Sequence, residues 1–222
     1  TWLCVGVLSV ISYGMPGRYT QHVSPTDVSN PAQSADRSPD SIGPAESNPS
    51  NANESELTAA TSQREVFAEA GLSYSPTAQP ARVFVGIATR LSGDAATDER
   101  IIGELWQSFT KNDISTVIEG IQDEQVYLVY SGYDRQRAAF ASAVLGYRVA
   151  RIGNVYAGLS GVRVPAASFA SWSSSQDPGG FLKRTWQRIG SLAEHPGGNH
   201  AVEVYTLDDS YDVRRIELQL QL

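Results

Sequence analysis

The C-terminal stretch RRIELQLQL, residues 214–222, decides the fold class of this chain. Ile216, Leu218 and Leu220 alternate there with charged or amide side chains. This period of two is typical of a strand with one buried and one polar face. The preceding stretch HAVEVYTL, residues 200–207, is rich in β-branched and aromatic residues and predicts another strand. The chain therefore ends in sheet structure.

Two helices and further strands are predicted upstream. Apolar residues recur at helical spacing in residues 94–112 and in residues 181–192. The predicted stripes hold Ile102, Leu105, Trp106 and Phe109 in the first helix and Leu182, Trp186 and Ile189 in the second. The remaining strands are predicted over residues 82–89, 125–133, 140–151 and 161–172, the last as a strand pair or a bent strand with Pro165 at an edge or bulge.

The order strand, helix, strands occurs twice. The first helix contains LWQ, residues 105–107, and the second contains TWQ, residues 185–187. A Val-Tyr pair follows each of them about 20 residues later, at 129–130 and 204–205. We therefore predict an α+β fold of two pseudo-symmetric strand-helix-strand-strand repeats. The repeats form an antiparallel sheet with two helices, and a ligand cleft is expected at their junction.

The N-terminal part differs from residues 81–222, which we predict to be the folded domain. Residues 1–23 form an apolar segment whose core, residues 2–13, is too short to span a bilayer. If residues 2–13 are a signal or an anchor, the protein is expected to be exported or held at the cell envelope. If they are not, a cytoplasmic protein is expected. Membrane contact is expected only through this core. Residues 24–80 are rich in Ser, Pro, Asn and acids and predict a disordered linker, with a short helix over 56–70 as an option.

Composition excludes several classes of function. The net charge is −7, so broad electrostatic binding to nucleic acid is not expected. The chain has one Cys and no standard zinc spacing, and His195 and His200 flank a loop without a third ligand nearby. Nucleotide, dinucleotide and hydrolase fingerprints are missing from the sequence. We predict no metal, no cofactor and no catalytic residues, and leave enzymatic activity open but disfavoured.

The order and spacing of these stretches over residues 82–222 resemble the GyrI-like effector-binding domain, the ligand-sensing part of AraC- and MerR-type regulators in bacteria. The matching stretches are FVGI (84–87), LWQSF (105–109), VYLVYSGY (126–133), GVRVPAASFASW (161–172), TWQRI (185–189) and EVY (203–205). The resemblance implies a cleft lined with aromatic rings and holding a buried carboxylate for amphipathic, often cationic molecules. Residues 24–80 have the wrong composition for DNA-binding helices, so a module without its own DNA-binding domain is expected.

Glu203 matches the position of that carboxylate. Glu203 and Tyr205 share one face of the predicted strand, while Val202 and Val204 share the other, which we expect to pack against a helix. Tyr130 corresponds to Tyr205 in the alignment of the two Val-Tyr pairs.

Trp106 and Trp186, on the helix stripes, complete the predicted ligand-binding set, although Trp on such a stripe also suits a plain core. The predicted partner is a small amphipathic or cationic ligand. Two alternatives remain: a gyrase-inhibitor-like protein-interaction domain, and a hydrolase of electrophilic small molecules with Glu203 as general base.

Overall fold

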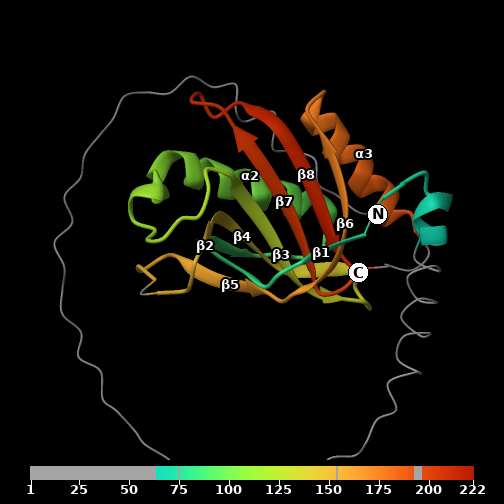
Figure 1. Ribbon diagram of the computed structural model, residues 1–222, viewed down its shortest axis with the longest axis horizontal. Helices are drawn as coiled ribbons and strands as arrows, with labels where there is room; N and C mark the ends of the chain where they lie inside the picture. Colours follow the sequence, from blue (N-terminus) through green and yellow to red (C-terminus); the bar gives the residue numbers. More distant parts are fainter. Residues whose placement is uncertain (1–63, 75, 154, 193–196) are drawn as a thin grey trace, which may run out of the picture.

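An antiparallel sheet of eight strands is the framework of the protein. The computed structural model describes residues 64–74, 76–153, 155–192 and 197–222 (Figure 1). Neighbouring strands follow the order β1-β6-β8-β7-β3-β4-β2-β5, and every pair is antiparallel. The strands are β1 (Pro76–Gln79), β2 (Arg82–Arg90), β3 (Val126–Asp134), β4 (Ala139–Val149), β5 (Ser160–Val164), β6 (Ala167–Ser174), β7 (His200–Leu207) and β8 (Val213–Gln221).

The helices begin where side chains can cap them. Asp94 accepts a hydrogen bond from the backbone N–H of Thr97 and starts α2 (Ala95–Asn112), as an N-cap residue does. The helix α3 (Pro178–Gly190) begins three residues earlier than predicted, because Asp177 caps it and Pro178 suits the first turn. A short 3-10 helix, η2 (Ile114–Thr116), follows α2. Both predicted apolar stripes are buried.

The strand order confirms the two predicted repeats. Reading outward from the central pair β3 and β7, the sheet continues with β4 and β2 on one side and with β8 and β6 on the other. Each repeat thus contributes the same three strands in mirrored order, with one helix each. Leu128 of β3 pairs with Glu203 of β7 at the centre. The pseudo-twofold axis therefore passes beside these two residues.

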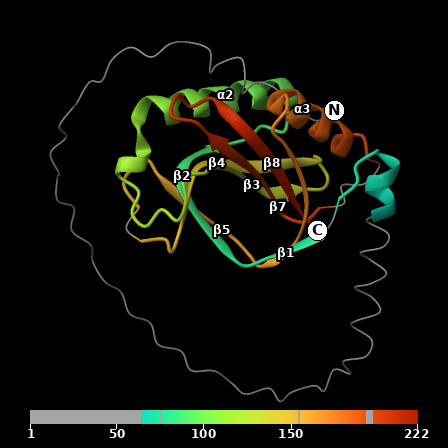
Figure 2. The same ribbon diagram turned by 45° about the horizontal axis from the view of Figure 1, so that its top comes forward.

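The sheet is open but curls so that its two ends approach each other. Only two residues connect β1 to β2, and two connect β5 to β6, although these strands lie at opposite ends of the strand order. Figure 2 shows the sheet bending beneath the helices, with β1 and β5 brought close together. Pro165 lies between β5 and β6, so residues 161–172 form a pair of strands and not one bent strand.

Two apolar clusters result, one on each face of the sheet. The outer face meets both helices, and its cluster includes Leu105, Leu182 and Tyr205. The inner face, inside the curl, holds a smaller cluster without helix residues: Phe84, Tyr127, Val129, Val164, Phe169, Val202 and Val204. The prediction that Val202 and Val204 pack against a helix is therefore wrong. The reason is that the curl supplies a second apolar interior, so an apolar strand face does not need a helix to cover it.

The linker prediction is wrong for residues 64–74 and 76–79, which pack on the domain. Residues 64–69 are helical, in the region where a short helix was an option, and β1 pairs with β6. Phe67 is fully buried, and its ring centroid lies 5.3 Å from that of Trp172. Leu72 is buried as well, and Tyr74 packs against Phe67 and Trp172, so a few apolar side chains give this polar stretch a burial that its average composition conceals. The predictions for residues 1–23, for residues 24–63 and for a signal or anchor in residues 2–13 lie outside the described residues.

None of the helices in the described part of the chain is both long enough and apolar enough to cross a membrane.

Candidate functional site

Glu203 lies at the centre of the outer face, beneath the helices. It is fully buried in β7, between Leu128 of β3 and Leu218 of β8, its cross-strand partners. The alternation of side chains along the strand turns it toward the helices together with Tyr205. A fully buried Glu is rare in proteins unless its oxygens are hydrogen-bonded or paired. Its surroundings therefore define the candidate site.

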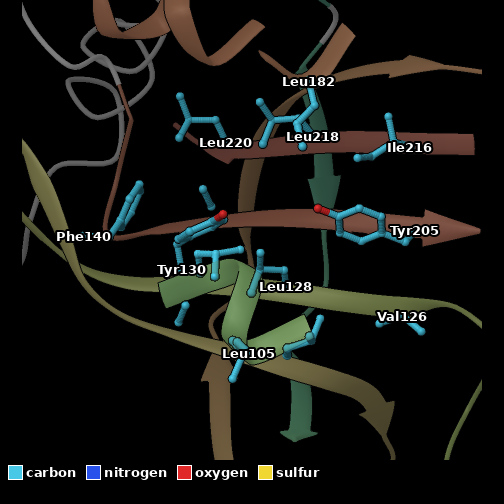
Figure 3. Packing of buried hydrophobic residues seen from close by; sticks show 14 of the residues in the cluster. Leu105, Val126, Leu128, Tyr130, Phe140, Leu182, Tyr205, Ile216, Leu218 and Leu220 are labelled. Atoms are coloured by element: carbon cyan, nitrogen blue, oxygen red, sulfur yellow. The ribbon is translucent and has the colours of Figure 1, made fainter. Parts of the chain in front are cut away.

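Three hydrogen bonds from neutral donors reach the two carboxylate oxygens of Glu203. Trp186 Nε1 of α3 donates to Oε1 over 2.7 Å, and the Tyr130 hydroxyl of β3 donates to the same oxygen over 3.1 Å. The Tyr205 hydroxyl donates to Oε2. Figure 3 shows the hydroxyl oxygens of Tyr130 and Tyr205 turned toward each other between Leu128 and Leu218. Such donors favour the charged form of a buried carboxylate.

The aromatic rings contact one another edge to face around the carboxylate. The Trp106 and Tyr205 ring centroids are 4.7 Å apart at an interplanar angle of 74°, and those of Tyr130 and Trp186 are 5.7 Å apart at 75°. Each pair joins a helix of one repeat to a strand of the other. Edge-to-face pairs of this kind add stability beyond the area they bury.

The five side chains predicted as a ligand site are therefore brought together. We name them the carboxylate box: Glu203, Tyr205, Tyr130, Trp106 and Trp186. None of the five is more than 3% exposed. The junction of the two repeats is thus filled by side chains in this structure. Phe140 of β4 is a neighbour that sequence reasoning missed, with its ring centroid 5.6 Å from that of Tyr130.

The carboxylate box breaks the symmetry of the repeats. Tyr130 and Tyr205 are equivalent, as are Trp106 and Trp186, so the equivalent of Glu203 is its cross-strand partner Leu128. Trp186 Nε1 has the carboxylate as acceptor, whereas nothing in the described part of the chain accepts a hydrogen bond from the buried Trp106 Nε1. Among the described residues, the indole N–H of Trp186 is therefore hydrogen-bonded and that of Trp106 is not. The sequence showed the paired tryptophans but not this difference.

This difference predicts unequal costs for the same substitution. Trp186→Phe removes a donor to a buried carboxylate, whereas Trp106→Phe removes an indole N–H that donates to none of the described residues. Because hydrogen bonds to charged groups contribute roughly 1.5–3 kcal/mol, we expect Trp186→Phe to lower the free energy of unfolding by about 2 kcal/mol more than Trp106→Phe. Urea unfolding of both variants measures the difference. Equal decreases in the free energy of unfolding would contradict the difference in hydrogen bonding between the two tryptophans.

Among the described residues, no group of three or more His, Cys, Asp or Glu side chains is placed to hold a metal ion. His200 is buried, and its Nδ1 shares a hydrogen bond with Gln221 Oε1 over 3.0 Å. His195 lies outside the described residues.

The fold and the family comparison define the protein as an effector-binding domain, a class that binds small molecules. Residues 77–221 match the Cass2 family model, described as integron-associated effector binding protein. The chain belongs to this family, which is part of the GyrI-like superfamily, and the resemblance seen in the sequence is confirmed.

Two solved structures resemble this chain at low sequence identity. The integron cassette protein VCH_CASS2, from the mobile metagenome of Vibrio cholerae, is 14% identical with a TM-score of 0.50, and the match covers 66% of this chain and 94% of that one. SAV2435, solved bound to tetraphenylphosphonium, is 10% identical with a TM-score of 0.49, covering 67% of this chain and 93% of that one. At these identities the likeness concerns the fold alone. A search of the curated proteins found no match.

Proposed function

We propose that this effector-binding domain takes up an amphipathic, cationic small molecule, with Glu203 as its counter-ion. The observation that carries the proposal is the complete burial of Glu203 among the rings of the carboxylate box. Burying a carboxylate costs free energy that hydrogen bonds offset only in part. A ligand cation beside it recovers Coulomb attraction in a medium where that attraction is weakly screened.

The aromatic rings suit the rest of such a ligand. Trp106, Trp186, Tyr130 and Tyr205 offer apolar surface to hydrophobic groups, and their faces attract a cation by about 0.5–2 kcal/mol each. Trp106 Nε1, which donates to none of the described residues, is positioned to donate to an acceptor on the ligand. A bulky organic cation matches these features better than a small inorganic one, which leaves the apolar surface unused.

The burial of the carboxylate box also bears on how the ligand enters. Its five side chains are at most 3% exposed, so an effector reaches Glu203 only after part of the cover moves. This opening lowers the apparent affinity by the fraction of molecules that are open. The tryptophans must then change surroundings when a ligand enters, and their fluorescence is expected to report binding.

In this proposal the domain acts through its ligand, or through a protein that senses the liganded state, and not by contacting DNA itself. The chain's net charge of −7 supports this, because phosphate contacts require clustered basic side chains. No described feature favours the gyrase-inhibitor-like or hydrolase alternatives over ligand binding.

A paired titration tests the proposal. The full chain is titrated with tetraphenylphosphonium, a hydrophobic monocation, and with triphenylphosphine oxide, a neutral aryl compound of comparable bulk, while tryptophan fluorescence is followed. We expect saturable quenching by both ligands, with the cation bound at least about tenfold more tightly, since 1.4 kcal/mol of charge attraction suffices for that ratio. If the cation and the neutral compound bind equally tightly, Glu203 is not a counter-ion. If neither ligand changes the tryptophan fluorescence in a saturable way, the carboxylate box is not a binding site.

A further inference from the structure

Arg82, the first residue of β2, lies on the inner face of the sheet and has no role in the carboxylate box. It is only 7% exposed. Its Nη1 donates to Gln219 Oε1 of β8 over 2.7 Å, across the interior of the curl. Its guanidinium carbon lies 5.0 Å from the ring centroid of Phe169 and 5.8 Å from that of Phe84. A charged group thus sits inside an otherwise apolar cluster.

Two N–H donor groups of the Arg82 guanidinium have no hydrogen-bond acceptor among the described residues. Arg82 Nε and Nη2 are both buried, and neither has a hydrogen-bond partner in the described chain. These two nitrogens form one edge of the planar group, on which their N–H bonds run parallel. That edge matches the two oxygens of a carboxylate or phosphate group, which arginine binds in bidentate fashion.

The neighbouring acceptors are engaged elsewhere. Glu217, on the same face, accepts at Oε1 from Gln219 Nε2 over 2.8 Å, and its Oε2 lies 4.0 Å from Arg215 Nη2. The Tyr127 hydroxyl lies within hydrogen-bond distance of Asp123 Oδ2, and Asp123 also pairs with Arg148. Burial lowers the pKa of the Arg82 guanidinium, but arginine in proteins stays protonated at neutral pH. A buried charge whose donors are unmatched is costly, and an anion on those donors removes the cost.

A second guanidinium lies on the same face. Arg148 of β4 pairs in register with Phe84, so it is a diagonal neighbour of Arg82. Its Nη2 binds Asp123 over 2.7 Å, while its Nε is buried without a described partner. The Arg148 side chain is 40% exposed, unlike that of Arg82. The Arg148 side chain therefore extends from the buried Arg82 donors to the solvent.

We propose that the inner face carries an oxyanion site, in which Arg82 Nε and Nη2 bind two oxygens of a carboxylate or phosphate group. Arg148 Nε adds a third donor at the solvent side. The site is separate from the carboxylate box, because the two lie on opposite faces of the sheet. The oxyanion site at Arg82 and the cation site at the carboxylate box are therefore independent, and each can be disproved without affecting the other.

Anion titrations of the full chain test this site. In Tris-chloride buffer at constant ionic strength, replacing chloride by acetate or by phosphate is expected to raise Tm by several degrees with a saturating dependence. The anion with the larger effect identifies the carboxylate or the phosphate chemistry. In the same titrations, the 15Nε–1Hε signal of Arg82 in the wild-type protein, assigned by through-bond correlation to the Arg82 backbone resonances, is expected to shift.

Arg82→Lys keeps the positive charge but removes the two parallel N–H donors of the guanidinium. We therefore expect the anion to bind at least tenfold more weakly, as read from the concentration dependence of Tm. Arg163→Lys, on the adjacent strand β5 and exposed, is the matched control and should leave the effect unchanged. If Arg82→Lys does not fold, the wild-type signal alone decides. The proposal is overturned if acetate and phosphate stabilise no more than chloride, if the Arg82 signal does not move, or if Arg82→Lys retains the full anion effect.

Discussion

Glu203→Gln is expected to weaken tetraphenylphosphonium binding about 100-fold, which corresponds to roughly 2.7 kcal/mol. Gln has nearly the same shape, and its carbonyl oxygen can still accept from Trp186 Nε1 and the Tyr130 hydroxyl. The substitution therefore removes the charge and leaves most of the packing. Binding of neutral triphenylphosphine oxide should change by less than threefold, because it does not use the charge. Fluorescence titration of both ligands measures the two effects.

Glu104→Gln is the matched control. It removes one negative charge at an exposed position of α2, where Glu104 pairs with Arg100. Its long-range effect on a cation in the carboxylate box is screened by solvent, so the affinity should stay within twofold of wild type. If Glu203→Gln binds the cation within threefold of wild type, Glu203 is not the counter-ion. If both variants lose affinity equally, only net charge matters.

Gly146→Ala is expected to lower the free energy of unfolding by about 3 kcal/mol or more. Gly146 of β4 pairs with Gly86 of β2, and the two backbones approach closely at this point. A Cβ on Gly146 would lie 2.1 Å from the carbonyl oxygen of Val85 and 2.5 Å from the Gly86 Cα. Both obstacles are backbone atoms, so relief requires the strands to separate and their ladder to weaken. Urea or thermal unfolding measures the loss.

Gly103→Ala provides a control of opposite sign. Gly103 lies within α2, and a Cβ added there meets no other atom within 4 Å. Replacing Gly by Ala inside a helix stabilises it by about 1 kcal/mol. We therefore expect the same chemical change to stabilise the protein at position 103 and to destabilise it at position 146. A Gly146→Ala protein as stable as wild type would show that the two strands can separate without cost.

Local periodicity accounts for how well the elements were predicted. The alternation in residues 214–222 predicts β8, and the stripe around Trp106 and Phe109 predicts α2, because each pattern reflects one buried face of its own element. Residues 64–74 and 76–79 were predicted as linker because their packing on the domain depends on a few contacts. Phe67 against Trp172 and β1 against β6 join segments far apart in the chain, and composition averages do not register such contacts.

In the candidate site too, some features were predictable from the sequence and others were not. Repeated local motifs identified Trp106, Trp186, Tyr130 and Tyr205, and the structure brings them together around Glu203. The unequal hydrogen bonding of the two tryptophans depends on which residue faces Glu203 across the axis. That is a matter of strand register between β3 and β7, which no local pattern encodes.

The sequence alone was enough to predict α2, α3, the strands of the two repeats and their twofold repetition, because each of these segments carries its own amphipathic period. Only the tertiary structure decided which strand face meets the helices and which lies inside the curl. It also decided that Arg82 meets Gln219, 137 residues away in the chain. The physical reason is that a strand's two faces are equivalent until its neighbours are in place, so the partners of a buried charge are set by long-range pairing and curvature.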